Sequence, residues 1–177
     1  MNPIILLHEG FEEMEAVAPI DLLVRAGIDP CLVSMSEELL VRGRSGILLQ
    51  AERCFDDLPD EIWDAVILPG GPGINQLRMH AGLCAFLKQH HDAGKIIACI
   101  CAAPLLLLDA GLLPGHYTAH PTTSTELPLA KEADYVWDQD ILTSRGAGTA
   151  TEFALALVEA LKGKTTRDKI ANSICCS

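Results

Sequence analysis

The chain has 177 residues, of which 49% are hydrophobic and 21% are charged, a composition that suits one globular domain with a buried core and argues against disorder. Its formal net charge is −11 and its thirteen Lys and Arg residues are scattered, so nucleic acid and anionic membranes are poor partners. No apolar run approaches the roughly 18 to 20 residues that cross a bilayer. The opening residues lack a basic region and predict a strand rather than a secretion signal.

The seven cysteines have neither of the spacings that would indicate a structural role. They lack the regular framework of a small disulfide-stapled domain, and no pair has the C-x-x-C spacing of a zinc site. We therefore expect free thiols in a reducing cytoplasm, and neither a metal nor another cofactor. The cysteines lie at positions 31, 54, 84, 99, 101, 175 and 176.

Strands and helices are predicted to alternate along the chain. Short apolar runs without period-two alternation predict strands that are covered on both faces, at 4–7, 31–33, 65–68 and 96–100. Apolar residues at helical spacing predict helices at 12–26, 76–92 and 150–162. Segment 134–144 predicts a short hairpin. This order predicts a single α/β domain over residues 1–177, a doubly wound sandwich whose ligands bind at the carboxyl ends of the strands.

The first predicted helix carries an acid, Glu15, on an apolar face. Most helical glutamates are solvated, and that interpretation stays open here. A buried glutamate without a cation would instead have a raised pKa and remain protonated, so that it could donate a hydrogen bond and transfer protons beside a thiolate. The apolar stripe through Glu15 consists of Phe11, Ala18, Pro19, Leu22 and Ala26.

The run "ILPGGPG" places Gly70, Gly71 and Gly73 directly after the third predicted strand. A tight turn between strand and helix would account for these glycines. The spacing is not that of a dinucleotide fingerprint, and no lysine makes it a phosphate-binding loop. Unhindered amides at this place could instead form an oxyanion hole beside a nucleophile.

The run "GKIIACICAAP" ends a predicted strand at a cysteine, Cys101, and continues into a predicted helix start. Small residues at Cys99 and Ala103, with Pro104 tolerated in the first helical turn, are typical of a nucleophile elbow. Backbone N–H groups at a helix start would lower the pKa of Cys101 from about 8.5 to roughly 3.5 to 7.5. The alternative is that Cys101 is a small buried hydrophobe. Cys99 is expected in the core.

One of the six histidines, His120 in "YTAHP", follows another short extended segment. Sequence logic alone does not distinguish it from the others. His80, His90, His91 and His116 are expected at the surface.

Taken together, these motifs resemble the ThiJ/PfpI superfamily, in particular the branch of the Parkinson-disease-associated protein deglycase and its bacterial relatives. The similarity runs nearly end to end, through "FEEMEAVAPIDLLVRAG", "DAVILPGG", "IIACICAAP", "AHP" and "LTSRGAGTATEFALALVEALKGK". The chain departs from the family where "AHP" replaces "THP". It departs again at "HEG", where His8 either lines the pocket or faces solvent.

The resemblance implies a flavodoxin-like sandwich, a homodimer and a role for each matching residue. Cys101 would be the nucleophile, Glu15 the protonated acid beside it, and His120 the residue across the pocket. The amides of Gly70, Gly71 and Ala102 would bind the oxyanion.

The activity implied by the resemblance is a glyoxalase or deglycase that acts on a small-molecule carbonyl substrate without a cofactor, converting methylglyoxal to lactate or glyoxal to glycolate. A response to oxidation through the same cysteine is also implied. A non-enzymatic redox sensor or holdase is the alternative of another class. A peptidase or amidase is disfavoured, because Ala102 and Ala103 stand where such enzymes place histidine or glycine.

Overall fold

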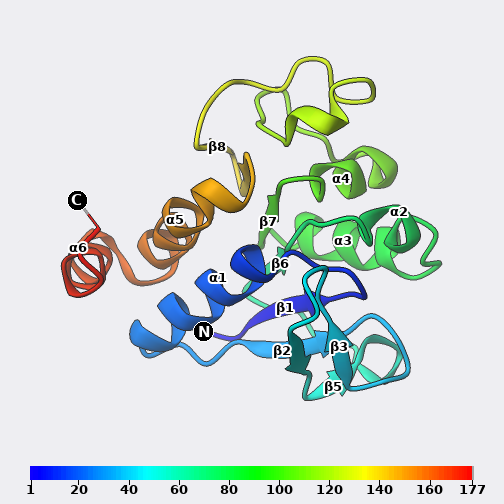
Figure 1. Ribbon diagram of the computed structural model, residues 1–177, viewed down its shortest axis with the longest axis horizontal. Coiled ribbons are helices and arrows are strands. Elements are labelled where there is room, and N and C mark those ends of the chain that lie inside the picture. Colours follow the sequence, from blue (N-terminus) through cyan, green and yellow to red (C-terminus); the bar gives the residue numbers. More distant parts are fainter. Residues whose placement is uncertain (177) are drawn as a thin grey trace.

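A seven-stranded sheet runs through the molecule, for which the computed structural model describes residues 1–176 (Figure 1). Its spatial order is β5-β2-β1-β6-β7-β9-β8, and only the β8–β9 pair is antiparallel. The strands are β1 (Pro3–Leu7), β2 (Cys31–Ser34), β5 (Arg53–Cys54), β6 (Ala65–Leu68), β7 (Ile96–Ile100), β8 (Tyr135–Asp138) and β9 (Ile141–Ser144). The predicted α/β sandwich is confirmed, as are its four parallel strands and the hairpin at 134–144.

Helices cover both faces of this sheet (Figure 1). On one face lie α1 (Glu13–Arg25), α5 (Ala150–Lys162) and α6 (Lys164–Ser173), and on the other lie α2 (Ile74–Leu77), α3 (Leu83–Asp92) and α4 (Pro104–Ala110). Among residues 1–176, no helix is long and apolar enough to cross a bilayer.

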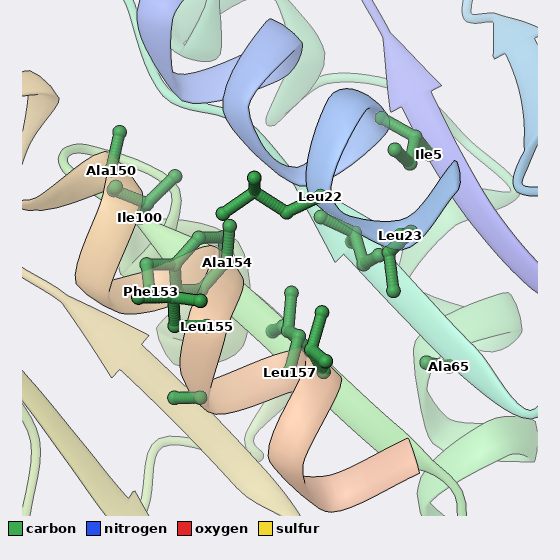
Figure 2. Close-up of a cluster of buried hydrophobic side chains, with 14 of the residues drawn as sticks. Ile5, Leu22, Leu23, Ala65, Ile100, Ala150, Phe153, Ala154, Leu155 and Leu157 are labelled. Carbon is green, nitrogen blue, oxygen red and sulfur yellow. The ribbon is translucent and has the colours of Figure 1, made fainter. Parts of the chain in front are cut away.

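The two cores explain why the strands are apolar without interruption. Along β1, Ile5 and Leu7 pack under α1 and α5, whereas Ile4 and Leu6 face the opposite helices. All four side chains are fully buried. Figure 2 shows the first core, in which Phe153 of α5 lies between the sheet and α1. Each fully buried side chain of this size stabilises the fold by about 1.5–3 kcal/mol.

The predicted helix at 76–92 is wrong as one element, because the chain leaves the helix after Leu77 and re-enters it at Leu83. The break contains Gly82, which has a low helix propensity and stands at the start of α3. Arg78 closes α2 and turns its side chain toward other segments.

The helix α6 and three short strands have no counterpart in the prediction. The three strands are the edge strand β5 and the two strands of a separate hairpin, β3 (Leu40–Arg42) and β4 (Leu48–Gln50). The hairpin is bonded to the start of α1, because the Ser45 N–H donates to Glu13 Oε1 at 2.7 Å.

His90 is not at the surface as predicted, but fully buried. Its Nε2 accepts from the Trp63 N–H at 3.0 Å, so the ring proton is on Nδ1, which donates to Phe86 O at 2.8 Å. This imidazole therefore ties α3 to the segment before β6. His116 is exposed as predicted, while His80 and His91 are partly buried.

Candidate functional site

Cys101 occupies a sharp turn between β7 and α4. Its φ of 66° lies in the left-handed region, which residues other than glycine rarely adopt. Two backbone hydrogen bonds hold it there: the Cys101 N–H donates to Ser144 O at 2.9 Å, and the His120 N–H donates to Cys101 O at 2.8 Å. The turn thus has the shape of the predicted elbow, with the strain that such sites store. The thiol is partly accessible, whereas Cys99 is fully buried.

Glu15 is the acid that the fold brings to this thiol. The α1 helix presents it to the sheet, where the residue is fully buried. Its Oε2 accepts from the Gly70 N–H at 2.8 Å, and its Oε1 has no hydrogen-bond partner among residues 1–176. Burial raises the pKa of Glu15 to about 7, although the Cys101 thiol and the Gly70 N–H oppose the shift. Of the two interpretations that the sequence left open for Glu15, the structure has the buried one.

Gly70 lets the turn after β6 approach the elbow. A β-carbon on Gly70 would lie 2.7 Å from Cys101 Cβ and 2.8 Å from Glu15 Oε2, too close for any side chain. Its N–H is bonded to Glu15, so Gly70 does not have the oxyanion role expected of it and instead orients the acid. The N–H groups of Gly71 and Ala102 lie near enough to the Cys101 sulfur to lower its pKa.

The pKa of the Cys101 thiol is raised, whereas the sequence predicted that it would be lowered. Burial raises the pKa of Cys101 well above its usual range, and the neighbouring Glu15 carboxylate raises it further, while the N–H groups of Gly71 and Ala102 lower it. The helix α4 begins only at Pro104, three residues after Cys101. Cys101 and Glu15 form a pair that loses one proton near pH 7 and the second far higher. Above pH 7 the pair therefore holds one proton, and transfer of this proton from sulfur to carboxylate makes a thiolate without changing the charge of the pair.

His120 is placed at the elbow through its backbone. Its Nδ1 accepts from the Thr122 N–H at 3.3 Å and lies 2.8 Å from Thr122 Oγ1, so the neutral ring carries its proton on Nε2. No hydrogen bond within residues 1–176 joins the ring to Cys101 or Glu15. The ring packs instead at Gly146, where a β-carbon would come 3.2 Å from His120 Cδ2.

Gly146 and Ser144 belong to the site but were not singled out by the sequence. Gly146 leaves room for the His120 ring, and a β-carbon there would lie 4.0 Å from Glu15 Oε1. The backbone carbonyl of Ser144 accepts a hydrogen bond from the Cys101 N–H. The sequence signal for both residues was the "TSRGAG" stretch at 143–148, which begins in β9 and continues into the turn after it.

His8, for which two placements were left open, is buried rather than facing solvent. Its ring lies between Glu9 O at 3.1 Å and Pro69 O at 3.2 Å, and burial lowers its pKa. It lines a cavity of about 240 Å³ with Gly73 and His80, and Cys101 is not among that cavity's residues. His8 thus holds the loop after β1 against the glycine turn. Within the described residues, no three His, Cys, Asp or Glu side chains are grouped as a metal site requires.

Several known proteins resemble this chain in sequence and in fold. Residues 3–160 match the model of the DJ-1/PfpI family. Protein DJ-1 homolog A of Arabidopsis thaliana is 35% identical over 96% of this chain, which spans only 45% of that relative's length. Glutathione-independent glyoxalase DJR-1.2 of Caenorhabditis elegans is 31% identical, with 97% of this chain and 94% of the relative covered. The structure of oxidized DJ-1 from Toxoplasma gondii superimposes with a TM-score of 0.91 at 34% identity, covering 98% of this chain and 97% of the other.

Proposed function

Because the chain belongs to the DJ-1/PfpI family, we propose that it acts on small carbonyl compounds as a glutathione-independent glyoxalase or a deglycase. Its substrates would be methylglyoxal, glyoxal or early glycation adducts. The observation that carries this proposal is the pair of Cys101 and Glu15, a strained and partly accessible thiol beside a buried carboxyl. The name of the C. elegans relative supports the choice of substrate class.

The reaction begins with proton transfer from the Cys101 sulfur to the Glu15 carboxylate. The thiolate attacks the aldehyde carbon of methylglyoxal and forms a C–S bond, which turns the carbonyl oxygen into an oxyanion. The N–H groups of Gly71 and Ala102 stabilise this charge, and preorganised donors of this kind are worth about 10²–10³ in rate. Glu15 returns its proton to the oxyanion, giving a hemithioacetal.

The second half of the reaction moves one hydrogen between neighbouring carbons. Glu15, again a carboxylate, removes the proton from the former aldehyde carbon and leaves an enediolate. Protonation of the former ketone carbon yields a thioester of lactate, and water cleaves its C–S bond to release lactate and the thiol. One carbon is oxidised as its neighbour is reduced, so the scheme needs no external oxidant or cofactor.

His120 serves this scheme as a proton carrier at the mouth of the site. Nε2 of its ring carries a proton, while Nδ1 accepts from Thr122. Its main chain is bonded to the elbow, which keeps the ring near the enediolate. The Nε2 proton would go to the substrate oxygen and return from water.

A redox sensor is the second candidate function, and one observation favours it. Glu15 Oε1 is buried without a hydrogen-bond partner within residues 1–176. A protonated Glu15 would donate from this atom to an oxygen of Cys101 sulfinate and stabilise the oxidised state. Both functions use the same thiol, so we propose oxidation as the event that ends catalysis.

The protein is further proposed to be a cytoplasmic homodimer. All seven cysteines are unpaired, which supports a reducing compartment. Large apolar side chains are exposed on α1 and on the hairpin bonded to it, among them Met14 at 58%, Ile47 at 54% and Leu40 at 51%. A second copy of the chain would cover this surface.

Substitution of the nucleophile tests the proposed activity. We expect Cys101→Ser to abolish lactate formation from methylglyoxal, because a hydroxyl next to Glu15 is too weak an acid to form the nucleophile. The control is Cys175→Ser, which changes an exposed thiol outside the site and should keep full activity. Lactate is measured enzymatically and folding by circular dichroism. Turnover retained in Cys101→Ser would overturn the assignment.

A further inference from the structure

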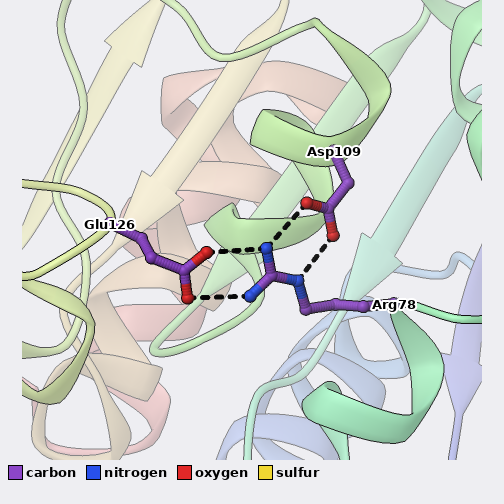
Figure 3. A network of polar contacts seen from close by, with 3 residues as sticks. All are labelled: Arg78, Asp109 and Glu126. Carbon is purple, nitrogen blue, oxygen red and sulfur yellow. Dashed lines mark hydrogen bonds and ion pairs between the residues drawn. The ribbon is translucent and has the colours of Figure 1, made fainter.

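Arg78 joins three segments that are far apart in the sequence (Figure 3). It donates from Nε and Nη2 to both carboxylate oxygens of Asp109, at 2.6 and 2.7 Å. It also donates from Nη1 and Nη2 to both carboxylate oxygens of Glu126, at 2.9 and 2.8 Å. One guanidinium thus makes four hydrogen bonds in two bidentate pairs, a geometry that lysine cannot supply.

Each of the three segments leads to a different part of the candidate site. Arg78 closes α2, the helix that follows the glycine turn of Gly71. Asp109 lies on α4, the helix that follows Cys101. Glu126 lies in the irregular loop that follows His120. The network therefore connects the three segments that carry the oxyanion amide, the nucleophile and the histidine of the proposed site.

The link from Glu126 to His120 is short and continuous. The Glu126 N–H donates to Thr123 O at 3.0 Å. The N–H and the hydroxyl of Thr123 both bond to His120 O, at 2.9 and 2.8 Å. A displacement of Glu126 would thus be carried to His120, whose own N–H is bonded to Cys101 O.

The side chains of Arg78 and Asp109 are partly shielded from solvent, whereas that of Glu126 is exposed. The side chains of Arg78, Asp109 and Glu126 are exposed by 21%, 26% and 47%. Hydrogen bonds to the two acids raise the pKa of Arg78, and Arg78 lowers the pKa of Glu126. By contrast, Arg25 and Asp21 form a single exposed contact within α1. A partly buried bidentate network orders its partners far better than such a surface pair.

We infer that Arg78 is a positioning residue, which fixes the positions of the His120 turn and of α4 relative to the glycine turn. This inference deepens the proposed function and rests on it for its catalytic consequence. Because a misplacement of about 1 Å can cost 10²-fold in rate, loosening the His120 turn should lower kcat more than it changes KM.

Two variants test the network from its two sides. Arg78→Lys keeps the positive charge but cannot make the two bidentate pairs of hydrogen bonds. Glu126→Gln leaves the pair of Arg78 and Asp109 intact and weakens the contact between Arg78 and the loop that contains residue 126. For both variants we expect kcat on methylglyoxal to fall on the order of 10-fold to 100-fold with KM within about threefold. Amides 120–127 should lose hydrogen-exchange protection, measured by mass spectrometry. The controls are Arg25→Lys and Glu132→Gln, whose side chains make exposed surface contacts, and neither should change these values.

The two readouts separate this inference from the proposed function. Hydrogen exchange reports on the His120 turn whether or not the protein turns over methylglyoxal. Unchanged protection of 120–127 in both variants would overturn the inference even if Cys101→Ser is inactive. Conversely, turnover retained by Cys101→Ser would overturn the proposed function and leave the exchange result standing. A wild-type kcat for Arg78→Lys would show that charge alone suffices and would also contradict the inference.

Discussion

The single residue Glu15 combines features that a surface glutamate does not have. It is fully buried, its Oε2 is bonded to Gly70, and no cation is bonded to it among the described residues. Its pKa is raised to about 7 by burial, against an ordinary value of 4.5. The folded protein therefore binds a proton more tightly at this group than the unfolded chain does.

This shift predicts how stability depends on pH. Since the folded pKa lies above the unfolded one, the contribution of Glu15 is fully present below pH 4.5 and is lost as pH rises to about 7. The loss amounts to about 3 kcal/mol, from 1.36 kcal/mol per unit of pKa. In urea unfolding, Glu15→Gln should gain stability relative to wild type by roughly this amount between pH 4.5 and 7.5. A stability difference that stays constant over this range would contradict the raised pKa.

At the scale of elements, the sequence predicts the strands that are buried on both faces and misses the short strands and α6. The strands β1, β2, β6 and β7 are visible in the sequence because two helical layers force every residue to be apolar. The strands β3, β4 and β5 have two or three residues each and are largely exposed, so they leave no such pattern. Helix 76–92 was predicted whole because apolar spacing continues across the break before Leu83.

The sequence singles out the cysteine and the acid of the candidate site, but not Ser144 or Gly146, and not the hydrogen bonds. The elbow at Cys101 and the buried Glu15 follow from local patterns of size and polarity. That the Gly70 N–H is engaged by Glu15 depends on contact between residues 55 positions apart, which no local pattern encodes. The raised pKa of Cys101 likewise depends on burial and on Glu15, and not on the helix start that the sequence shows.

The turn after β6 offers a test at the same scale. Gly70→Ala would place a β-carbon 2.7 Å from Cys101 Cβ and 2.8 Å from Glu15 Oε2, so the turn must move away from the elbow. We expect kcat on methylglyoxal to fall at least about 100-fold through loss of the Gly71 donor. Gly148→Ala is the matched control, because its β-carbon would meet no atom within 4 Å. Equal activity of the two variants would mean that the turn tolerates displacement.

At the scale of the whole molecule, the net charge of −11 makes copies of the chain repel one another. Burial of apolar surface between two copies can offset this repulsion. The exposed apolar side chains of α1 and of the β3–β4 hairpin provide such a surface. We therefore expect sedimentation to give twice the 19.0 kDa of one chain. Ile47→Glu should shift the protein toward monomer, whereas Leu129→Glu, at a side chain 77% exposed on another part of the surface, should not. A wild-type monomer at micromolar concentration would contradict this.

Once their pair has lost its first proton near pH 7, Cys101 and Glu15 share the remaining proton and thereby present a reactive sulfur. The most direct measurement is the rate at which iodoacetamide alkylates Cys101 across pH 5 to 10, read by mass spectrometry of the Cys101 peptide, in wild type and in Glu15→Gln. We predict that the wild-type rate rises with a midpoint near pH 7, where the pair loses its first proton, and that this step is absent in Glu15→Gln. A midpoint near 8.5 in both proteins, the value of a free thiol, would show that Glu15 does not govern the sulfur.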